Sequence, residues 1–342
     1  MLKKVFGKVF CAFFRTDAVL IFKLRFILSN NINYQQMIKT KLVQLLKCPK
    51  CMKGTLVISP EREELVCEEC SANFPVINDI PQLLPYQSKT DLPESEIHQQ
   101  YGTKFDYIDH YQKDALVYDY FAERDSVTEH SDRRLREYVA SHITREQRII
   151  LDVGCGNAWV ARMFCRKGYD VVSIDISNEN TSEALKKYPL ENHSAVVADV
   201  YSLPFKNNSF DYIIASEIIE HVASPDLFIA ALFKVLAPGG TLIITTPYKE
   251  KLKYSLCIHC NKPTPHNAHL HSFDEVILKS LYSGKDMKSF HFEFFNNKVL
   301  AFLHMHIILK YCPFKIWKII DRLMNLIYNP PLRILGKWEK RI

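Results

Sequence analysis

The feature that most constrains the fold is a short apolar run that ends in an acid and two glycines. Residues 148–156 read Arg-Ile-Ile-Leu-Asp-Val-Gly-Cys-Gly, and a helical pattern begins at Trp159. The apolar run predicts a buried parallel strand. The glycines let the backbone approach a ligand at the start of the helix, where N–H groups are unpaired. Many nucleotide-binding sheets contain one such turn, so the residues that follow decide its meaning.

Further apolar strands alternate with helical segments beyond this turn. We expect strands at residues 171–175, 195–199, 210–216 and 241–246, and the first two end in Asp175 and Asp199. This alternation predicts an α/β fold with a doubly wound, mainly parallel sheet. Ligands bind beyond the carboxyl ends of such strands, and an acid where Asp175 lies commonly accepts hydrogen bonds from ribose hydroxyls.

Five motifs in this region occur in an order and spacing that resemble the class I S-adenosylmethionine (SAM) methyltransferases. The resemblance covers roughly residues 146–300 and implies a Rossmann-like fold, SAM as cofactor and methyl transfer as the activity. The motifs are Leu151-Asp-Val-Gly-Cys-Gly156, Ser173-Ile-Asp-Ile176, Ala198-Asp199 with Leu203-Pro-Phe205, Phe210-Asp-Tyr212 with Ser216-Glu-Ile-Ile-Glu-His-Val222, and Leu236-Ala-Pro-Gly-Gly-Thr-Leu242.

The resemblance also implies which residues bind SAM. The family usually has a third glycine where this chain has Ala158, which narrows the room at the helix start. Ser216 and Glu217 are expected to face the donor or the acceptor. The implied cofactor-binding residues are Asp152, Gly154, Cys155 and Gly156 at the methionine end, Asp175 and Ile176 at the ribose, Asp199 and Val200 beside the adenine, and Ser216.

Two C-x-x-C pairs, fifteen residues apart, predict a metal site upstream. Four thiolates at this spacing can surround one zinc ion tetrahedrally, which leaves no position open for water, so the zinc would be structural. The segment from Leu45 to Pro85 resembles the zinc ribbon of the small tRNA-methyltransferase activator family. The alternative is four free or disulfide-bonded cysteines, but no secretion signal favours oxidation. The ligands would be Cys48, Cys51, Cys67 and Cys70.

A second zinc site is predicted just after the fifth strand. Cys257-Ile-His-Cys260 is followed by His269 and His271, and a C-x-x-C pair with nearby histidines is a plausible ligand set. The alternative is a substrate-side loop whose histidines make ordinary hydrogen bonds.

The run Glu217-x-x-Glu220-His221 resembles that of ubiquinone-pathway O-methyltransferases and small-RNA 2′-O-methyltransferases. The resemblance implies a divalent ion near the acceptor hydroxyl, held by these residues and a later histidine. His271 falls at that later position, so the two metal hypotheses compete for it. Without a metal, His221 is the first candidate for the base that removes an acceptor proton and Glu217 the second. Alternatively, both side chains only shape the helix start.

Charge is concentrated at the two ends of the chain. Residues 1–47 contain nine Lys and Arg residues and one acid, Asp17. Residues 310–342 contain eight Lys and Arg residues and two acids, Asp321 and Glu339. The part between them therefore has eight more acidic than basic residues. Both ends space apolar residues at helical intervals, with Ile316, Ile320 and others in the second. Such basic amphipathic segments either lie on an anionic membrane surface or pack against the protein. Charges interrupt every apolar run, which excludes a spanning helix or a signal peptide.

These observations predict the organisation of the chain. We expect a basic amphipathic extension over residues 1–36, with Met37 as an alternative start, a zinc ribbon over 37–90, a helical linker that covers the SAM pocket over 91–145, and a methyltransferase domain over 146–342 that ends in a basic amphipathic segment over 310–342. Within the linker, a helix is expected over 131–142, with Leu135 facing inward.

Three functions fit this organisation. The first is a cytoplasmic methyltransferase, attached to a membrane periphery or free, that acts on an unidentified small-molecule, lipid-linked or saccharide hydroxyl. The second is an RNA-modifying methyltransferase, which the acidic middle of the chain disfavours. The third is a non-catalytic SAM-binding scaffold, which the intact Asp152, Asp175 and Asp199 disfavour.

Overall fold

A computed structural model describes residues 41–59, 64–85, 98–100, 103–144, 148–258, 261–328 and 331–342. The predicted extension over residues 1–36 lies outside these ranges. The chain divides into two units, Met1–Gln44 and Leu45–Ile342. The second unit contains every strand that the structure describes.

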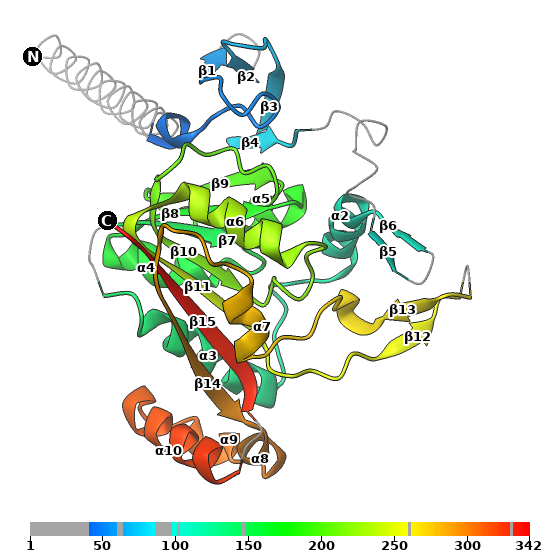
Figure 1. Ribbon diagram of the computed structural model, residues 1–342, viewed down its shortest axis with the longest axis vertical. Helices are drawn as coiled ribbons and strands as arrows, with labels where there is room; N and C mark the ends of the chain where they lie inside the picture. Colours follow the sequence, from blue (N-terminus) through cyan, green and yellow to red (C-terminus); the bar gives the residue numbers. More distant parts are fainter. Residues whose placement is uncertain are drawn as a thin grey trace, which may run out of the picture. The chain divides into compact units, whose positions relative to one another are not determined.

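Five parallel strands form the centre of the main sheet (Figure 1). Their order is β9-β8-β7-β10-β11, so the direction in which the strands are added reverses at β7. Their carboxyl ends therefore meet at one edge, with loops that diverge on either side of β7. The predicted doubly wound, mainly parallel sheet is confirmed. The strands are β7 (Ile149–Val153), β8 (Asp170–Asp175), β9 (His193–Ala198), β10 (Phe210–Ser216) and β11 (Leu236–Pro247).

Two antiparallel strands, β14 (Met287–Asn297) and β15 (Pro331–Lys340), complete one side of the sheet. β15 lies between β11 and β14 and pairs with both in antiparallel register. Residues 310–342, which the sequence predicts to be one amphipathic segment, form helix α10 (Phe314–Ile327) and strand β15. Trp338 is fully buried, because β15 has a paired strand on each side, β11 and β14, and both of its faces are covered.

The cysteine-rich segment continues the same sheet on its other side. Its last strand, β4, pairs in parallel with β9, so that Leu83 lies opposite Ala198. The amide of Lys206 also donates to the carbonyl of Leu45 at 2.8 Å. The backbone thereby joins this segment to the central sheet, which reaches eleven strands. The strands of the segment are β1 (Leu56–Ser59), β2 (Glu64–Cys67), β3 (Asn73–Ile77) and β4 (Ile80–Leu83).

Helices cover both faces of the sheet. On one face, Leu135 of α3, Phe164 of α4 and Trp317 of α10 belong to one buried cluster with Tyr212 of β10. Alternate residues of β10 point to the opposite face, where α6 contacts β11 and α7 contacts β15. These helices are α3 (Ser126–Ala140), α4 (Trp159–Phe164), α6 (Pro225–Val235) and α7 (Glu275–Ser280), with η3 (Cys165–Lys167) extending α4.

The linker helix predicted at 131–142 is part of α3, which begins after Asp125. The carboxylate of Asp125 accepts from the amides of Val127 and Thr128 and so caps the helix. Leu135 faces inward as expected. The remaining elements are α2 (Tyr107–Val117), α5 (Asn178–Lys187), α8 (Lys298–Phe302), α9 (His306–Leu309), η4 (His266–Ala268), and the two-stranded pairs β5 (His98–Gln100) with β6 (Thr103–Phe105) and β12 (Tyr254–Leu256) with β13 (Pro263–Pro265).

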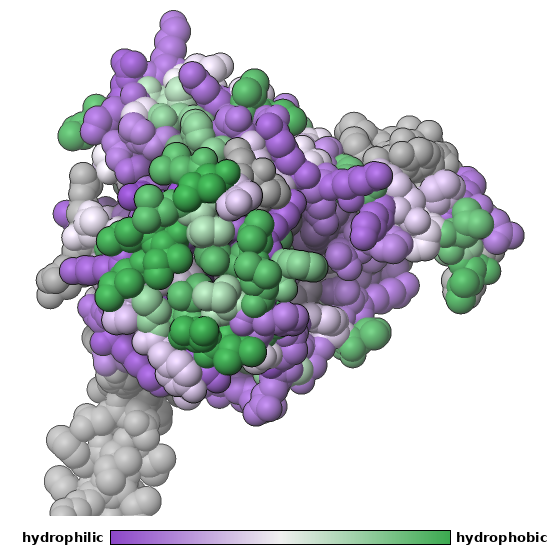
Figure 2. Space-filling view, turned by 90° about the horizontal axis from the view of Figure 1, so that it is seen from below, coloured by the Kyte–Doolittle hydropathy of each residue, from purple (hydrophilic) through white to green (hydrophobic). Residues whose placement is uncertain are grey.

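Helix α10 is held to the end of β14 by one buried carboxylate. Asp321 is fully buried and accepts hydrogen bonds from the amides of Asn296 at 3.1 Å and Asn297 at 2.8 Å. The outward side of α8, α9 and α10 carries a concentration of apolar side chains (Figure 2). Among the described residues, no helix is both long enough and apolar enough to cross a membrane.

We predict that Asp321→Ala lowers the free energy of unfolding by about 2–3 kcal/mol, because it leaves two buried amides without an acceptor. Denaturant unfolding of the whole chain measures this change. Asp226→Ala removes an exposed carboxylate and serves as the control, with an expected change within about 0.5 kcal/mol. Equal effects of the two substitutions would contradict the role assigned to Asp321.

Candidate active site and metal centre

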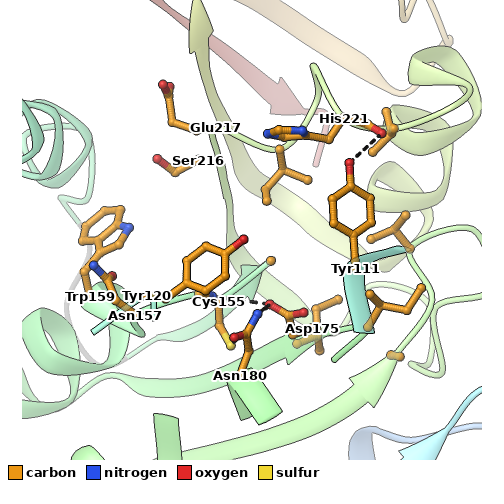
Figure 3. A pocket seen from close by; sticks show the side chains of 18 of the residues that line it. Tyr111, Tyr120, Cys155, Asn157, Trp159, Asp175, Asn180, Ser216, Glu217 and His221 are labelled. Carbon is orange, nitrogen blue, oxygen red and sulfur yellow. Dashed lines mark hydrogen bonds between the residues drawn. The ribbon is translucent and has the colours of Figure 1, made fainter. Parts of the chain in front are cut away.

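A cavity of about 280 Å³ opens at the carboxyl ends of β7, β8, β9 and β10 (Figure 3). Asp175 and Asn180 lie along one side of it, and Ser216, Glu217 and His221 lie along the other. The structure therefore brings together most of the residues predicted to bind the cofactor or to act in catalysis. These are Gly154, Cys155, Gly156, Asp175, Ile176, Val200, Ser216, Glu217 and His221.

The glycine turn after β7 needs glycine for two separate reasons. Gly154 and Gly156 have φ of 66° and 43°, in the left-handed region that disfavours other residues. A Cβ at Gly154 would lie only 2.2 Å from Cδ1 of Ile218. Ala158, in the place of the expected third glycine, also has a positive φ of 50° and is fully buried. Alanine therefore fits here, but in a strained backbone conformation.

Asp175 at the end of β8 receives donors from three places. Its carboxylate accepts from the amides of Ser177 at 3.0 Å and Gly156 at 3.4 Å, and from the side-chain amide of Asn180 at 3.2 Å. Burial nevertheless raises the pKa of Asp175 above its usual value. A ligand with hydroxyl groups in this cavity could donate to the same carboxylate.

Asp152 and Asp199 do not line the cavity, but they form hydrogen bonds with residues around it. Asp152 is buried and accepts from the hydroxyl of Ser173 at 3.3 Å, and burial raises its pKa well above the usual value. Asp199 is fully buried, and its two carboxylate oxygens accept from the hydroxyl of Tyr107 at 2.8 Å and the amide of Tyr201 at 3.0 Å. Val200, next to Asp199, does line the cavity.

The linker contributes aromatic residues that motif comparison alone did not place. Tyr107 and Tyr111 on α2, and Tyr120 after it, line the cavity opposite the strand ends. The hydroxyl of Tyr120 donates to Asp114 at 2.7 Å, and this bond keeps the ring over the glycine turn. A Cβ added at Gly156 would lie 3.4 Å from this ring. The resemblance implies that the linker covers the SAM pocket, and these tyrosines are side chains with which it lines the cavity.

Glu217 lies at the boundary between this cavity and a second one. Its φ is 57°, and its carboxylate accepts from Nε of Arg333 at 2.9 Å. Arg333 also forms an ion pair with Asp132 at 3.6 Å. The other carboxylate oxygen of Glu217, Oε1, is buried without a hydrogen-bond partner among the described residues. This oxygen is therefore available to a ligand at the boundary.

The second cavity, of about 550 Å³, lies between α3, α8, α9, α10 and the loop after β11. It shares Asp132 and Glu217 with the first cavity. Nδ1 of both His130 and His306 is buried without a partner among the described residues. The cationic side chains that line it are Lys251, Lys253, Lys298 and Arg333.

Glu220, His221 and His269 form a second cluster of potential ligands beside the first cavity. One ligand atom from each lies within 4.8 Å of the others. Burial raises the pKa of Glu220 well above the usual value and lowers that of His221 to about 4. Nδ1 of His221 is 3.3 Å from the carbonyl oxygen of Ala268, while Nδ1 of His269 is 2.5 Å from the carboxylate of Glu250. One carboxylate and two imidazoles suit a divalent ion.

The four cysteines of the ribbon fit one zinc ion. Cys48 and Cys70 place their sulfur atoms 3.7 Å apart, and so do Cys51 and Cys67. Tetrahedral zinc with Zn–S bonds of about 2.3 Å requires sulfur atoms roughly 3.8 Å apart. All four ligand atoms lie within 4.8 Å of one another.

Backbone groups support these thiolates. The amide of Gly54 donates to Sγ of Cys51 at 3.2 Å, and the amide of Cys70 donates to Sγ of Cys67 at 3.5 Å. A Cβ at Gly54 would lie 2.2 Å from Sγ of Cys67, so the turn admits only glycine. The zinc is structural, because the four thiolates complete its coordination.

The second predicted zinc site stays a prediction. Cys260 lies outside the described residues. Cys257 lies directly after β12, and His269 belongs to the group with Glu220 and His221. His271 lies in the same loop, where its amide is 3.3 Å from the carbonyl oxygen of Glu220. In the described residues, it is thus His269 rather than His271 that joins the Glu-x-x-Glu-His run.

Comparison with known families supports both halves of this description. Residues 151–244 match the model of the methyltransferase domain family, and residues 39–79 match that of the Trm112p-like proteins. The two resemblances noted from the sequence are therefore confirmed. The chain combines a class I methyltransferase domain with a Trm112-like zinc ribbon.

Curated relatives align with the methyltransferase domain only. The mitochondrial ubiquinone biosynthesis O-methyltransferase of Rattus norvegicus is 39% identical over 115 residues, which is 32% of this chain and 33% of that protein. The ubiquinone biosynthesis O-methyltransferase of Xanthomonas campestris is 32% identical over 126 residues, which is 36% of this chain and 52% of that protein. The chain thus spans between a third and about half of the length of these relatives.

Solved structures resemble the chain more distantly. The complex between the Haloferax volcanii Trm112 methyltransferase activator and a methyltransferase aligns with a TM-score of 0.45 at 15% identity, over 70% of this chain and 100% of that one. Phosphoethanolamine N-methyltransferase 2 of Haemonchus contortus, in complex with SAM, aligns with a TM-score of 0.45 at 16% identity, over 62% of this chain and 53% of that one.

We predict that replacing two ribbon cysteines, Cys67→Ser with Cys70→Ser, removes about one zinc ion per chain, because two thiolates alone cannot complete the site. Elemental analysis of the purified protein measures the loss. The pair Cys165→Ser with Cys312→Ser removes two thiols outside the ribbon and should leave the zinc content unchanged. Unchanged zinc in the Cys67/Cys70 variant would overturn the assignment.

Proposed function

We propose that this chain is a SAM-dependent methyltransferase that acts on an acceptor hydroxyl. The observation that carries the proposal is the placement of Asp175, the glycine turn and His221 around one cavity at the reversal point of the sheet. The matched methyltransferase domain spans all three. A binding protein without catalysis needs the first two but has no use for a buried histidine on the opposite side.

Different residues would bind different parts of the donor. Gly154 and Gly156 let the backbone approach the methionine end of SAM. Asp175 accepts the ribose hydroxyls, and Val200 borders the adenine. Tyr120 covers the glycine turn and, with the other linker tyrosines, excludes water. Exclusion of water and fixed geometry supply most of the rate enhancement in a transfer of this kind.

When bound, SAM would supply the methyl group of its sulfonium to the acceptor oxygen and would leave as S-adenosylhomocysteine. The residues of the chain must then take the hydroxyl proton. His221 is the candidate for this role, because it lines the cavity and its imidazole is neutral; burial lowers its pKa to about 4, which makes it a weaker base than an ordinary histidine. Its Nδ1–H can donate to the carbonyl of Ala268, which leaves Nε2 to accept the proton.

Glu217 is better suited to positioning than to proton removal. Its carboxylate forms an ion pair with Arg333, and this pairing of its negative charge makes it a weaker proton acceptor. The free oxygen Oε1 faces the boundary between the cavities and can orient an acceptor hydroxyl.

The alternative to proton removal by His221 is a divalent ion held by Glu220, His221 and His269, which would lower the pKa of the acceptor hydroxyl. The relatives named O-methyltransferases favour an oxygen acceptor. The Glu-x-x-Glu-His run and the grouping of Glu220, His221 and His269 favour such an ion. A cation would also offset the burial of the Glu220 carboxylate. In that case His221 is a metal ligand and not the base.

The second cavity is the proposed acceptor site. It meets the donor cavity at Glu217 and Asp132. Its lining has as many carboxylates as cations, but Arg333 pairs with Glu217 and Asp132, and the two other acids have partners of their own, so the three lysines favour an anionic group on the acceptor. A small-molecule or lipid-linked acceptor fits such an enclosed space. RNA is the competing acceptor, and the acidic middle of the chain speaks against it.

We predict that Asp175→Ala weakens SAM binding by about 1–3 kcal/mol, because it removes charge-assisted hydrogen bonds to the ribose. Titration calorimetry with SAM measures the change. Asp170→Ala, at the opposite end of the same strand, is the matched control and should bind like wild type. Unchanged affinity in the Asp175 variant would exclude the ribose assignment.

We predict that His221→Ala lowers the rate of methyl transfer by about 10²–10⁴-fold, with SAM affinity close to wild type. The rate is the transfer of label from methyl-labelled SAM to the fraction of cell extract that accepts it. His291→Ala, on the exposed side of β14, is the control. A rate near that of wild type would remove His221 from the mechanism.

A chelator separates the two roles of His221. If His221 acts as the base, chelation leaves the rate of the wild-type protein unchanged. If it is a metal ligand, chelation stops turnover, added divalent cation restores it, and His269→Ala reproduces the loss.

A further inference from the structure

The outward side of α8, α9 and α10 is apolar in a way that packing among the described residues does not explain. Of the twenty-five large hydrophobic side chains that are exposed in the described residues, eleven fall between Phe302 and Tyr328. Figure 2 shows them as one broad apolar surface at the end of the molecule that bears these helices. They are Phe302, Leu303, Ile307, Ile308, Tyr311, Ile316, Ile319, Leu323, Leu326, Ile327 and Tyr328, and we call them the helical apolar face.

Helix α10 is apolar on two sides, and only one of them packs on the protein. Trp317 is 2% exposed and packs against Tyr138 in the core, with the two rings in a T-shaped arrangement. On the other side, Ile319, Leu323 and Leu326 are 59%, 53% and 82% exposed. Their spacing of four and three residues makes a continuous stripe along the helix. The expectation that α10 buries its apolar residues against the domain therefore holds for its inner side alone.

The exposed charges on these helices are positive, although Lys318 and Arg322 of α10 form ion pairs with Glu293 of β14. Between Lys298 and Tyr328 the chain has five Lys and Arg residues and a single acid, Asp321, which is fully buried. Lys298, Lys310 and Lys315 are exposed on the same helices. An apolar surface with exposed lysines on the same helices is complementary to anionic headgroups above hydrocarbon.

We propose that the helical apolar face docks on an anionic lipid membrane, with α10 in the plane of the interface. The stripe around Leu323 enters the boundary between headgroups and acyl chains, while Lys298, Lys310 and Lys315 lie among the headgroups. Each lysine near such a surface raises affinity about fivefold at low salt. The apolar side chains add a term that salt does not screen.

A second copy of the chain is a poorer occupant of the same face. An isologous contact would place the same lysines against one another, with no accessible acid on these helices to neutralise them. A membrane has no such conflict, since its own charge is negative.

The position of the face gives the docking a consequence for the acceptor. Lys298, Leu300 and His306, from α8 and α9, line the second cavity, and Trp317 of α10 lines it too. The helices that meet the membrane thus form one wall of the proposed acceptor site. This step rests on the proposed function: an acceptor with an anionic group and a lipid tail could reach the cavity from the bilayer.

Vesicle sedimentation tests the docking without any methyl acceptor or SAM. The full-length protein is mixed at low salt with vesicles of phosphatidylcholine alone or with phosphatidylglycerol added. We expect binding to the anionic vesicles only. Leu323→Ser with Leu326→Ser should weaken it by roughly tenfold or more, because two exposed leucines leave the interface. Lys310→Gln with Lys315→Gln should weaken it at low salt and leave little further effect of added salt.

Leu227→Ser with Val276→Ser is the matched control, since both side chains are exposed on helices far from this face in sequence, at 59% and 69%. It should bind like wild type. No binding of wild type to anionic vesicles overturns the proposal, and so does equal binding by the Leu323/Leu326 variant. Light scattering provides a further arm: a wild-type dimer that the Leu323/Leu326 variant loses assigns the face to a second copy. A protein that binds vesicles but transfers no methyl group refutes the proposed function alone.

Discussion

The parallel pairing of β8, β7 and β10 determines where the donor side of the candidate site lies. Each of these strands ends at the same edge of the sheet, and each delivers one part of the site there. β7 delivers the glycine turn, β8 delivers Asp175, and β10 delivers Ser216 with Glu217. The cavity forms between them because the loops diverge where the strand order reverses. The side chains are far apart in sequence, and only this pairing makes them neighbours.

The first residues of the antiparallel strand β15 lie at the same edge. Because it runs against β11, its first residues lie beside the last residues of β11, and Arg333 pairs with Pro247 in the register. Arg333 can therefore reach Glu217 and Asp132 and form the boundary between the two cavities. An ion pair at this boundary fixes Glu217 in its unusual backbone conformation, and the acceptor side of the site depends on the C-terminal residues as much as on the motifs.

The sequence predicted the parts of this arrangement that depend on local pattern. The alternation of strands and helices, the glycine turn and the C-x-x-C pairs each carry a short-range signal, and the sheet and the four-cysteine cluster agree with them. It did not predict that β15 lies inside the sheet, because Arg333 and Lys337 made residues 331–340 look like the end of a basic segment. Nor did it predict that the carboxylate of Asp199 binds Tyr107, or that His269 lies with His221, since tertiary packing alone sets those contacts. The second cavity has no motif at all.

The central claim is that a methyl group passes from a donor beside Asp175 to an acceptor held beyond Glu217. Incubation of the purified protein with methyl-labelled SAM and separated fractions of cell extract tests it most directly. The account predicts that a lipid or small-molecule fraction gains label in an alkali-resistant ether linkage, while RNA gains none. Label in RNA would contradict the acceptor site described above. Binding of SAM with no label in any fraction would contradict methyl transfer itself.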